Sequence, residues 1–177
     1  MSLVVVAASG TSGAGRGLKE SLLATEVMGS MSTYKVGGVH QHTPEIEQEL
    51  SLIAGGDVCV SFTPLLAPMP RGIISTCTAQ VADSVTESQL RDALHSAYER
   101  EPFVQVLAND AWPQTGSVSG SNMAQLQLAV DAHSNRVVVV CAIDNLGKGA
   151  AGQALQNANI ITGFSETAGL SVNGVAP

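Results

Sequence analysis

Aromatic and charged side chains are both scarce in this 177-residue sequence, at 3% and 13% of its residues. The charges are also unbalanced, since 8 Lys and Arg face 15 Asp and Glu, which gives a net charge of −7 with neutral His. Nucleic-acid-binding proteins usually carry a basic face, so we exclude that class. Hydrophobic residues nevertheless make up 45% of the chain, which predicts a folded domain with a core of small aliphatic side chains.

Long hydrophobic runs are missing too. The longest, at residues 137–143, is far shorter than the about 20 residues of a membrane span, and the apolar start of the chain lacks the basic region of a secretion signal. We therefore expect a cytoplasmic protein without a membrane segment. Cysteines are few and odd in number, and they lie in Val/Ile/Thr-rich segments, which favours buried, reduced thiols over disulfides: Cys59, Cys77 and Cys141.

Hydrophobic periodicity and turn residues predict an α+β fold with a mixed, largely antiparallel sheet and helices on one face. We expect one domain over residues 1–177, with residues 1–3 left over from expression of a fragment. Association into a dimer or tetramer through the second face of the sheet is expected as well. The expected strands are residues 3–8, 33–36, 57–66, 71–82, 103–107, 123–132 and 136–143, and the expected helices are residues 18–27, 43–53, 87–99 and 148–162.

A glycine-rich loop follows the first expected strand at residues 9–17. Its glycines do not have the G-x-G-x-x-G spacing of a dinucleotide-binding turn, so a loop shaped by backbone geometry is the preferred interpretation. Its N–H groups and Arg16 still form a candidate anion site. Lys148 begins the last expected helix, where either an anion or a tightly packed partner surface would suit the glycine-rich sequence.

Two histidines, His40 and His42, precede a helix whose first turns are rich in carboxylates. We expect Thr43 to cap this helix and Pro44 to occupy its first turn, with Ile46, Leu50 and Ile53 forming an apolar stripe. The chemistry of the pair leaves three hypotheses: an acid–base imidazole, a metal pair, or a capped loop. The metal hypothesis is weak because no third ligand cluster is apparent.

Four segments, taken together and in order, resemble the N-acetyl-gamma-glutamyl-phosphate reductase family. They read SGTSGAGR, GGVHQHTPEIEQ, VSFTP with PMPRG, and AIDNLGKGAAGQALQ, at residues 9–16, 37–48, 60–72 and 142–156. The resemblance covers only the C-terminal, substrate-binding and dimerisation domain of that family, a fold shared with glyceraldehyde-3-phosphate and semialdehyde dehydrogenases. It implies NADPH-dependent reductive dephosphorylation of N-acetyl-glutamyl 5-phosphate to the semialdehyde, a step of arginine biosynthesis.

The resemblance also implies catalytic roles. His40 matches the family's acid–base histidine, and His42 and Glu45 match supporting positions, whereas Gln41 stands where the family usually has Arg. The nucleophilic Cys lies in an Asn-Pro-Gly-Cys segment upstream of the glycine loop, and none of the three cysteines here has that context. We therefore expect the chain alone to be inactive.

Ligand contacts follow from the same resemblance. We expect Arg16 and Lys35 to bind the substrate's phosphate or carboxylate, and Ser12, Gly13 and Asn145 to line the nicotinamide end of the cofactor site. NADP itself would be bound mainly by the family's N-terminal domain, which is also the expected partner, and no metal is expected. Two alternatives stay open: a domain of the aspartate-semialdehyde dehydrogenase type, and a non-catalytic anion-binding or assembly module.

Overall fold

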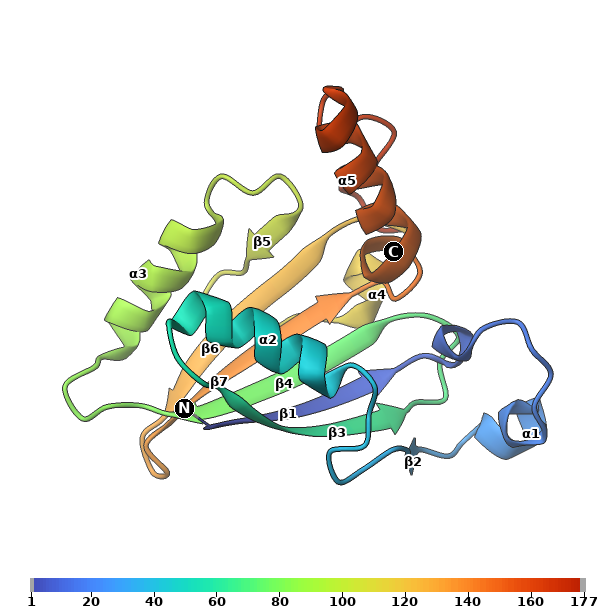
Figure 1. Cartoon of the computed structure of the whole chain (residues 1–177), viewed down its shortest axis with the longest axis horizontal. Coiled ribbons are helices and arrows are strands. Elements are labelled where there is room, and N and C mark those ends of the chain that lie inside the picture. Colours follow the sequence, from blue (N-terminus) through green and yellow to red (C-terminus); the bar gives the residue numbers. More distant parts are fainter. Residues whose placement is uncertain (1, 176–177) are drawn as a thin grey trace.

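The computed structural model describes residues 2–175 and is built around a mixed seven-stranded sheet with the order β2-β3-β1-β4-β7-β6-β5 (Figure 1). The pairs β1–β3 and β5–β6 are parallel, and the other four neighbouring pairs are antiparallel. The expected fold class is thus confirmed. The strands are β1 (Ser2–Ser9), β2 (Ser32–Thr33), β3 (Cys59–Leu66), β4 (Ile73–Gln80), β5 (Val104–Val106), β6 (Ala124–Asp131) and β7 (Arg136–Ile143).

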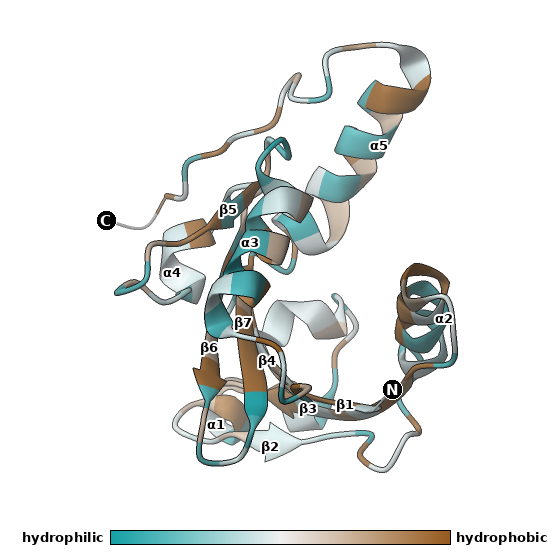
Figure 2. Ribbon diagram, turned by 90° about the vertical axis from the view of Figure 1, so that its left-hand side faces the viewer, coloured by the Kyte–Doolittle hydropathy of each residue, from teal (hydrophilic) through white to brown (hydrophobic). Residues whose placement is uncertain are grey.

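Of the two longest helices, the first lies in front of the sheet in Figure 1, and the second lies beside the edge formed by β5 and β6. They are α2 (Thr43–Ala54) and α3 (Glu87–Tyr98). The one-turn helix α4 (Thr115–Val118) lies on the opposite side from α2, and α5 (Gly152–Thr162) extends away from the sheet (Figure 2). Among residues 2–175, no helix combines the length and hydrophobicity needed to cross a membrane.

The core lies between α2 and the strands that it covers. Val5, Val58 and Val60 are buried, and Ile46 and Leu50 of α2 pack against them. The expected stripe on α2 is therefore confirmed over its first turns. It does not continue to the end of the helix, because Ile53 is 85% exposed.

The opposite face of the sheet carries two rows of side chains that we call the open face. One row joins Val4, Thr78 and Val138, and the other joins Val6, Thr76 and Val140, each across β1, β4 and β7. Val4 and Val6 are 36% and 37% exposed. Small β-branched side chains give this face a flat surface with apolar character.

Three expectations about the first helical segment, the second strand and the cysteines were wrong. Residues 18–27 form only a short 3₁₀ turn and the single-turn helix α1 (Ala24–Val27), with Leu18 99% exposed. Helices of this length are marginal without an apolar surface to pack against. Strand β2 ends at Thr33, because Lys35 has a left-handed φ of 46° that an extended chain cannot adopt.

The third error concerns Cys59, which is exposed rather than buried. Strand alternation places it between the buried residues Val58 and Val60, so its side chain points to the opposite face. Cys77 and Cys141 are half-buried. Met1 lies outside the described residues, and Ser2 and Leu3 belong to β1.

Candidate active site

The histidine pair is carried on the irregular loop that joins β2 to α2. The loop is attached to the sheet through the N–H of Tyr34, which donates to the carbonyl of Pro64 at 3.3 Å. Gly37 and Gly38 follow with φ values of 86° and 80°, a conformation that favours glycine. The chain thereby turns sharply and places His40 beside the start of α2.

His40 is the buried centre of an aromatic cluster. Its side chain is 8% exposed, and its ring centroid lies 5.0 Å from those of His42 and Phe62 and 5.7 Å from that of Tyr34, all edge-to-face. The backbone N–H of His42 donates to His40 Nδ1 at 3.2 Å. Ring packing and this hydrogen bond together hold the imidazole in one orientation.

The surroundings of His40 favour its neutral form. Burial lowers its pKa, and the neighbouring charges of His42 and Lys35 lower it further. Burial also raises the pKa of the Tyr34 phenol, which stays a neutral hydroxyl. An imidazole that is uncharged near neutral pH has the protonation state that hydrogen-bond or acid–base chemistry requires.

The supporting residues lie on the first turn of α2 but are less enclosed. His42 and Glu45 are exposed. The expected cap at Thr43 was wrong, because His42 is the N-cap and its carbonyl accepts the first helical N–H, that of Ile46, at 3.0 Å. Thr43 is instead the first helical residue, and its buried hydroxyl has no hydrogen-bond partner among the described residues.

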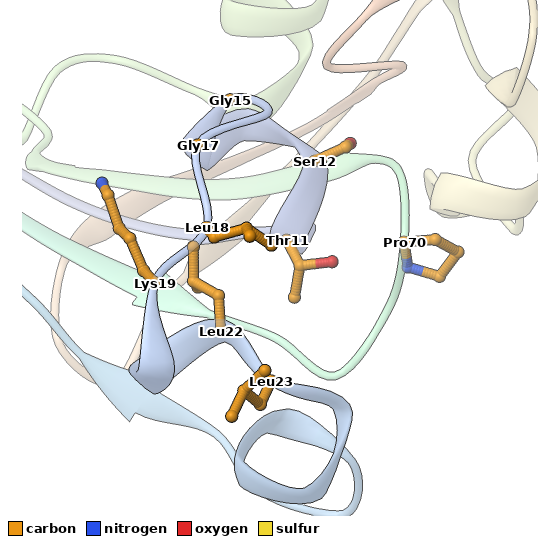
Figure 3. Close-up of a pocket in the computed structure, with 9 residues that line it drawn as sticks. All are labelled: Thr11, Ser12, Gly15, Gly17, Leu18, Lys19, Leu22, Leu23 and Pro70. Atoms are coloured by element: carbon orange, nitrogen blue, oxygen red, sulfur yellow. The ribbon is translucent and has the colours of Figure 1, made fainter.

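The two expected substrate-binding cations are in different settings. Lys35 Nζ donates to Gln41 Oε1 at 3.0 Å. Gln41, which replaces the usual Arg of the family, therefore holds the positive charge of Lys35 close to the histidines. Arg16 is exposed on the glycine loop. That loop borders a groove of about 300 Å³ lined by Thr11, Ser12, Gly15, Gly17, Leu18, Lys19, Leu22, Leu23 and Pro70 (Figure 3). Arg16 therefore lies near a groove, and among the described residues it makes no hydrogen bond or ion pair with His40.

The three expected cofactor-lining residues do lie together. Asn145 Nδ2 donates to Ser12 Oγ at 3.0 Å, and Asn145 Oδ1 accepts the N–H of Gly72 at 2.7 Å. A methyl group at Gly13 would lie 3.5 Å from the same Nδ2. Asn145 is 6% exposed, so it shapes the turn that presents Ser12 and Gly13.

A buried ion pair next to this cluster was missed by sequence reasoning. Asp144 is completely buried and forms a 2.8 Å ion pair with Arg71, whose side chain is 42% exposed. Burial alone would raise the pKa of Asp144, but hydrogen bonds from the N–H groups of Gly120, Gly147 and Leu146 and from Arg71 hold that pKa below its ordinary value. The carboxylate therefore ties three loops to the end of β7.

Lys148 is joined to α5 rather than open to solvent. Its Nζ donates to Gln156 Oε1 at 2.7 Å and lies 5.8 Å from the centroid of Phe103. Burial lowers its pKa, while the charges of Glu166 and Glu101 act in the opposite direction. The structure thus favours the packing interpretation of this lysine over an anion site.

The thiols of Cys77 and Cys141 are poorly suited to nucleophilic attack at neutral pH. Burial raises the pKa of Cys77, and burial together with Cys77 raises that of Cys141 to about 11. Within residues 2–175, no group of three or more His, Cys, Asp or Glu is arranged to hold a metal ion.

Comparison with known proteins supplies the family. The model of the semialdehyde dehydrogenase dimerisation domain matches residues 1–145. The chain belongs to the semialdehyde dehydrogenase dimerisation-domain family. Among curated relatives of this dimerisation domain, the N-acetyl-gamma-glutamyl-phosphate reductases of Acidothermus cellulolyticus and Arthrobacter sp. are 64% and 60% identical over 99% of the chain. The chain spans 51% of the length of each, about half of a relative.

Solved structures show the same dimerisation-domain fold. Aspartate semialdehyde dehydrogenase II from Vibrio cholerae is 15% identical, with a TM-score of 0.71 over 91% of this chain and 54% of that one. The enzyme from Francisella tularensis has a TM-score of 0.60 at 16% identity, over 75% of this chain and 39% of the other. At such low identities the likeness concerns the fold alone.

Proposed function

We propose that the chain is the substrate-binding and dimerisation domain of an NADP-dependent N-acetyl-gamma-glutamyl-phosphate reductase. The observation that carries this proposal is identity of 55–64% to reductases of that name across nearly the whole chain. In this proposal residues 1–177 form one domain, and a second domain supplies the rest of the enzyme. The reaction is the reductive dephosphorylation of N-acetyl-glutamyl 5-phosphate in arginine biosynthesis, in the cytoplasm.

His40 is the proposed catalytic imidazole, and the geometry supports this role better than a merely structural one. Its ring is fixed by Tyr34, Phe62 and the N–H of His42, as a group that must meet a reacting atom should be. His42 and Glu45 would shape the entrance, since both are exposed beside it. The three thiols are not proposed as nucleophiles, so the attacking Cys would come from the other domain.

The charged and cofactor-facing residues have proposed roles in binding rather than in catalysis. Lys35, held by Gln41 near His40, would bind an anionic group of the substrate, and its position supports it better than that of Arg16. NADP, which supplies hydride when bound, would be held mainly by the other domain. The turn at Ser12 and Gly13 would face the nicotinamide ring. Its side chains are small, and the hydrogen bond from Asn145 to Ser12 fixes its position.

The test is an assay of the full-length enzyme that contains this chain. We expect phosphate-dependent oxidation of N-acetyl-glutamate semialdehyde with NADP, and a much lower rate with aspartate semialdehyde. Preference for aspartate semialdehyde would instead support the alternative enzyme, which the structural neighbours suggest by fold alone. No activity with either substrate, in a folded enzyme that binds NADP, would leave the non-catalytic module as the better explanation.

The open face is the proposed dimer interface. Its rows of Val and Thr are partly exposed and uncharged, and interfaces between subunits are depleted of charge at their centres. The family model is itself described as a dimerisation domain. Sedimentation of the chain as a monomer at micromolar concentration would count against this assembly.

A further inference from the structure

We propose that residues 14–31, which we call the arm, dock on a second copy of this chain and thereby hold the turn at Ser12 and Gly13. The inference rests on the proposed function, from which it takes the pairing through the open face and the binding role of that turn. It adds a second contact surface to the pair. It also makes the cofactor-facing turn of one copy depend on the presence of the other.

The arm has no hydrophobic core of its own, and none of its residues is buried. Its two regular pieces are the 3₁₀ turn at Glu20–Leu22 and the helix α1, and neither contains a buried side chain. Four large apolar side chains of the arm are 51–99% exposed: Leu18, Leu23, Met28 and Met31. Single apolar residues on a surface are ordinary, but four in one short segment indicate a surface that binds a partner.

The hydrogen bonds of the arm are internal as well. Within the described part of the chain, its backbone N–H groups donate only to carbonyls of residues 12–27. The chain is attached to the sheet on either side of the arm, because the N–H of Ser12 donates to the carbonyl of Pro70 at 3.2 Å and Ser32 pairs with Leu66. Ordering a backbone costs conformational entropy, and one-turn helices do not recover that cost alone. The arm therefore needs a surface from outside the single copy.

The arm lies on the side of the sheet that would meet a second copy. In Figure 2, α1 and α2 lie on opposite sides of β3, and α2 packs on the core side of the sheet. The arm is thus on the same side as the open face. In Figure 1 it lies beyond the arrowheads of β1 and β3, so a copy that covered the open face would have the arm at its border.

The arm also offers a partner an apolar recess. Leu18, Leu22 and Leu23 line the groove of about 300 Å³, and Pro70 lies across from them (Figure 3). An apolar side chain of a second copy placed in this groove would remove the leucines from water, which favours association.

The distribution of charge is compatible with a second copy as the partner. The arm is neutral, since Arg16 and Lys19 balance Glu20 and Glu26, whereas the whole chain carries a net charge of −7. Two acidic copies repel each other least where a neutral segment lies between them. The matched family is also described as a dimerisation domain, so we assign the arm to the same assembly as the open face.

Docking of the arm has a consequence for ligand binding. The arm begins directly after Ser12 and Gly13, and the hydrogen bond from Asn145 to Ser12 holds that turn from the side of β7. A partner that held the arm would restrain the turn from its other end. Nicotinamide binding at the turn should therefore be stronger in the pair than in the single copy.

The first test is limited proteolysis of the 177-residue chain with trypsin, with the fragments identified by mass spectrometry. Trypsin cleaves after Arg16 and Lys19 in the arm. Arg100 is the internal control, because its side chain is 92% exposed and it is followed by Glu, as Lys19 is. We expect slow cleavage in the arm of the wild-type dimer and rapid cleavage in the Val6→Asp monomer, with cleavage after Arg100 equal in both.

Two results of this test would overturn the inference. Equal cleavage of the arm in dimer and monomer would show that the second copy does not cover it. Protection in the full-length enzyme but not in the dimer of the 177-residue chain would show that the other domain covers the arm instead.

The second test replaces an apolar side chain of the arm. Leu18→Glu removes no buried contact within one copy, because Leu18 is 99% exposed, and it should raise the dimer Kd of the chain about 10-fold or more in sedimentation. In the full-length enzyme it should raise the KM for NADP about 5-fold or more. Leu52→Glu is the matched control, since Leu52 is 71% exposed on α2, and it should change neither value.

Unchanged association of Leu18→Glu would refute docking of the arm, and weaker association with an unchanged KM would refute its hold on the turn. Absence of reductase activity in the wild-type enzyme would refute the proposed function alone. The proteolysis and sedimentation results do not depend on catalysis, so they would still decide whether the arm docks on a second copy.

Discussion

The buried carboxylate of Asp144 offers the sharpest test of how the loops at the end of the sheet are held. It accepts hydrogen bonds from the N–H groups of Gly120, Leu146 and Gly147 at 2.6, 2.8 and 2.9 Å, besides its ion pair with Arg71. Replacement by Ala leaves all these donors without their acceptor. The effect should therefore exceed that of a typical surface substitution by a wide margin.

The magnitude follows from burial. Removing one partner of a buried ion pair costs about 3–5 kcal/mol, and the lower end applies because the Arg71 side chain is 42% exposed and water can solvate it. We expect Asp144→Ala to lower the free energy of unfolding by about 3 kcal/mol, or about 100-fold in the folding equilibrium. Asp144→Asn retains one acceptor oxygen and should lose about 2 kcal/mol.

Urea unfolding followed by far-ultraviolet circular dichroism measures these differences. Asp110→Ala is the matched control, since Asp110 is exposed and its replacement should change the free energy by less than about 0.5 kcal/mol. If Asp144→Ala stays within about 1 kcal/mol of wild type, the carboxylate does not hold the loops and the reasoning is refuted.

Three further predictions concern pH, packing and assembly. The pKa of His40 is lower in the folded state, so as pH falls the unfolded state binds the proton first, and the free energy of unfolding should decrease below about pH 6.5. His40→Gln should remove this decrease, which urea midpoints measured against pH would show. Gly10→Ala places a methyl 2.9 Å from neighbouring backbone and should cost about 1–3 kcal/mol, whereas Gly56→Ala meets nothing within 4 Å and should not. Val6→Asp should give monomers in sedimentation, whereas Ile53→Asp, away from the open face, should not.

Local patterns were sufficient to predict the longer regular elements. The period of Ile46 and Leu50 located α2, and the Ser134 and Asn135 turn located the β6–β7 hairpin. Local reasoning failed where the backbone departed from regular geometry, as at Lys35 with its left-handed φ. It also failed at Cys59, although strand alternation with Val58 and Val60 contained the signal.

Only some of the contacts between residues far apart in the sequence could be predicted. Asn145 and Ser12 are 133 residues apart, and family resemblance alone placed them in one site. Arg71 and Asp144 are 73 residues apart, and no periodicity or spacing links them. Their pairing depends on the register of β4 against β7, which is a property of the assembled sheet. The orientation of the His40 ring depends on a backbone N–H, so it could not be predicted from the identities of the side chains either.

The two rows of the open face, the proposed dimer interface, have a consequence for how mutations there would act on association. In a two-fold symmetric pair the same patch meets its own copy, so each position of Val4 and Val6 occurs twice in one interface. A single substitution there would alter two contacts at once, so the change in the free energy of association would be about twice that of one contact. Such a surface would respond to small changes in sequence more steeply than either face of an isolated sheet.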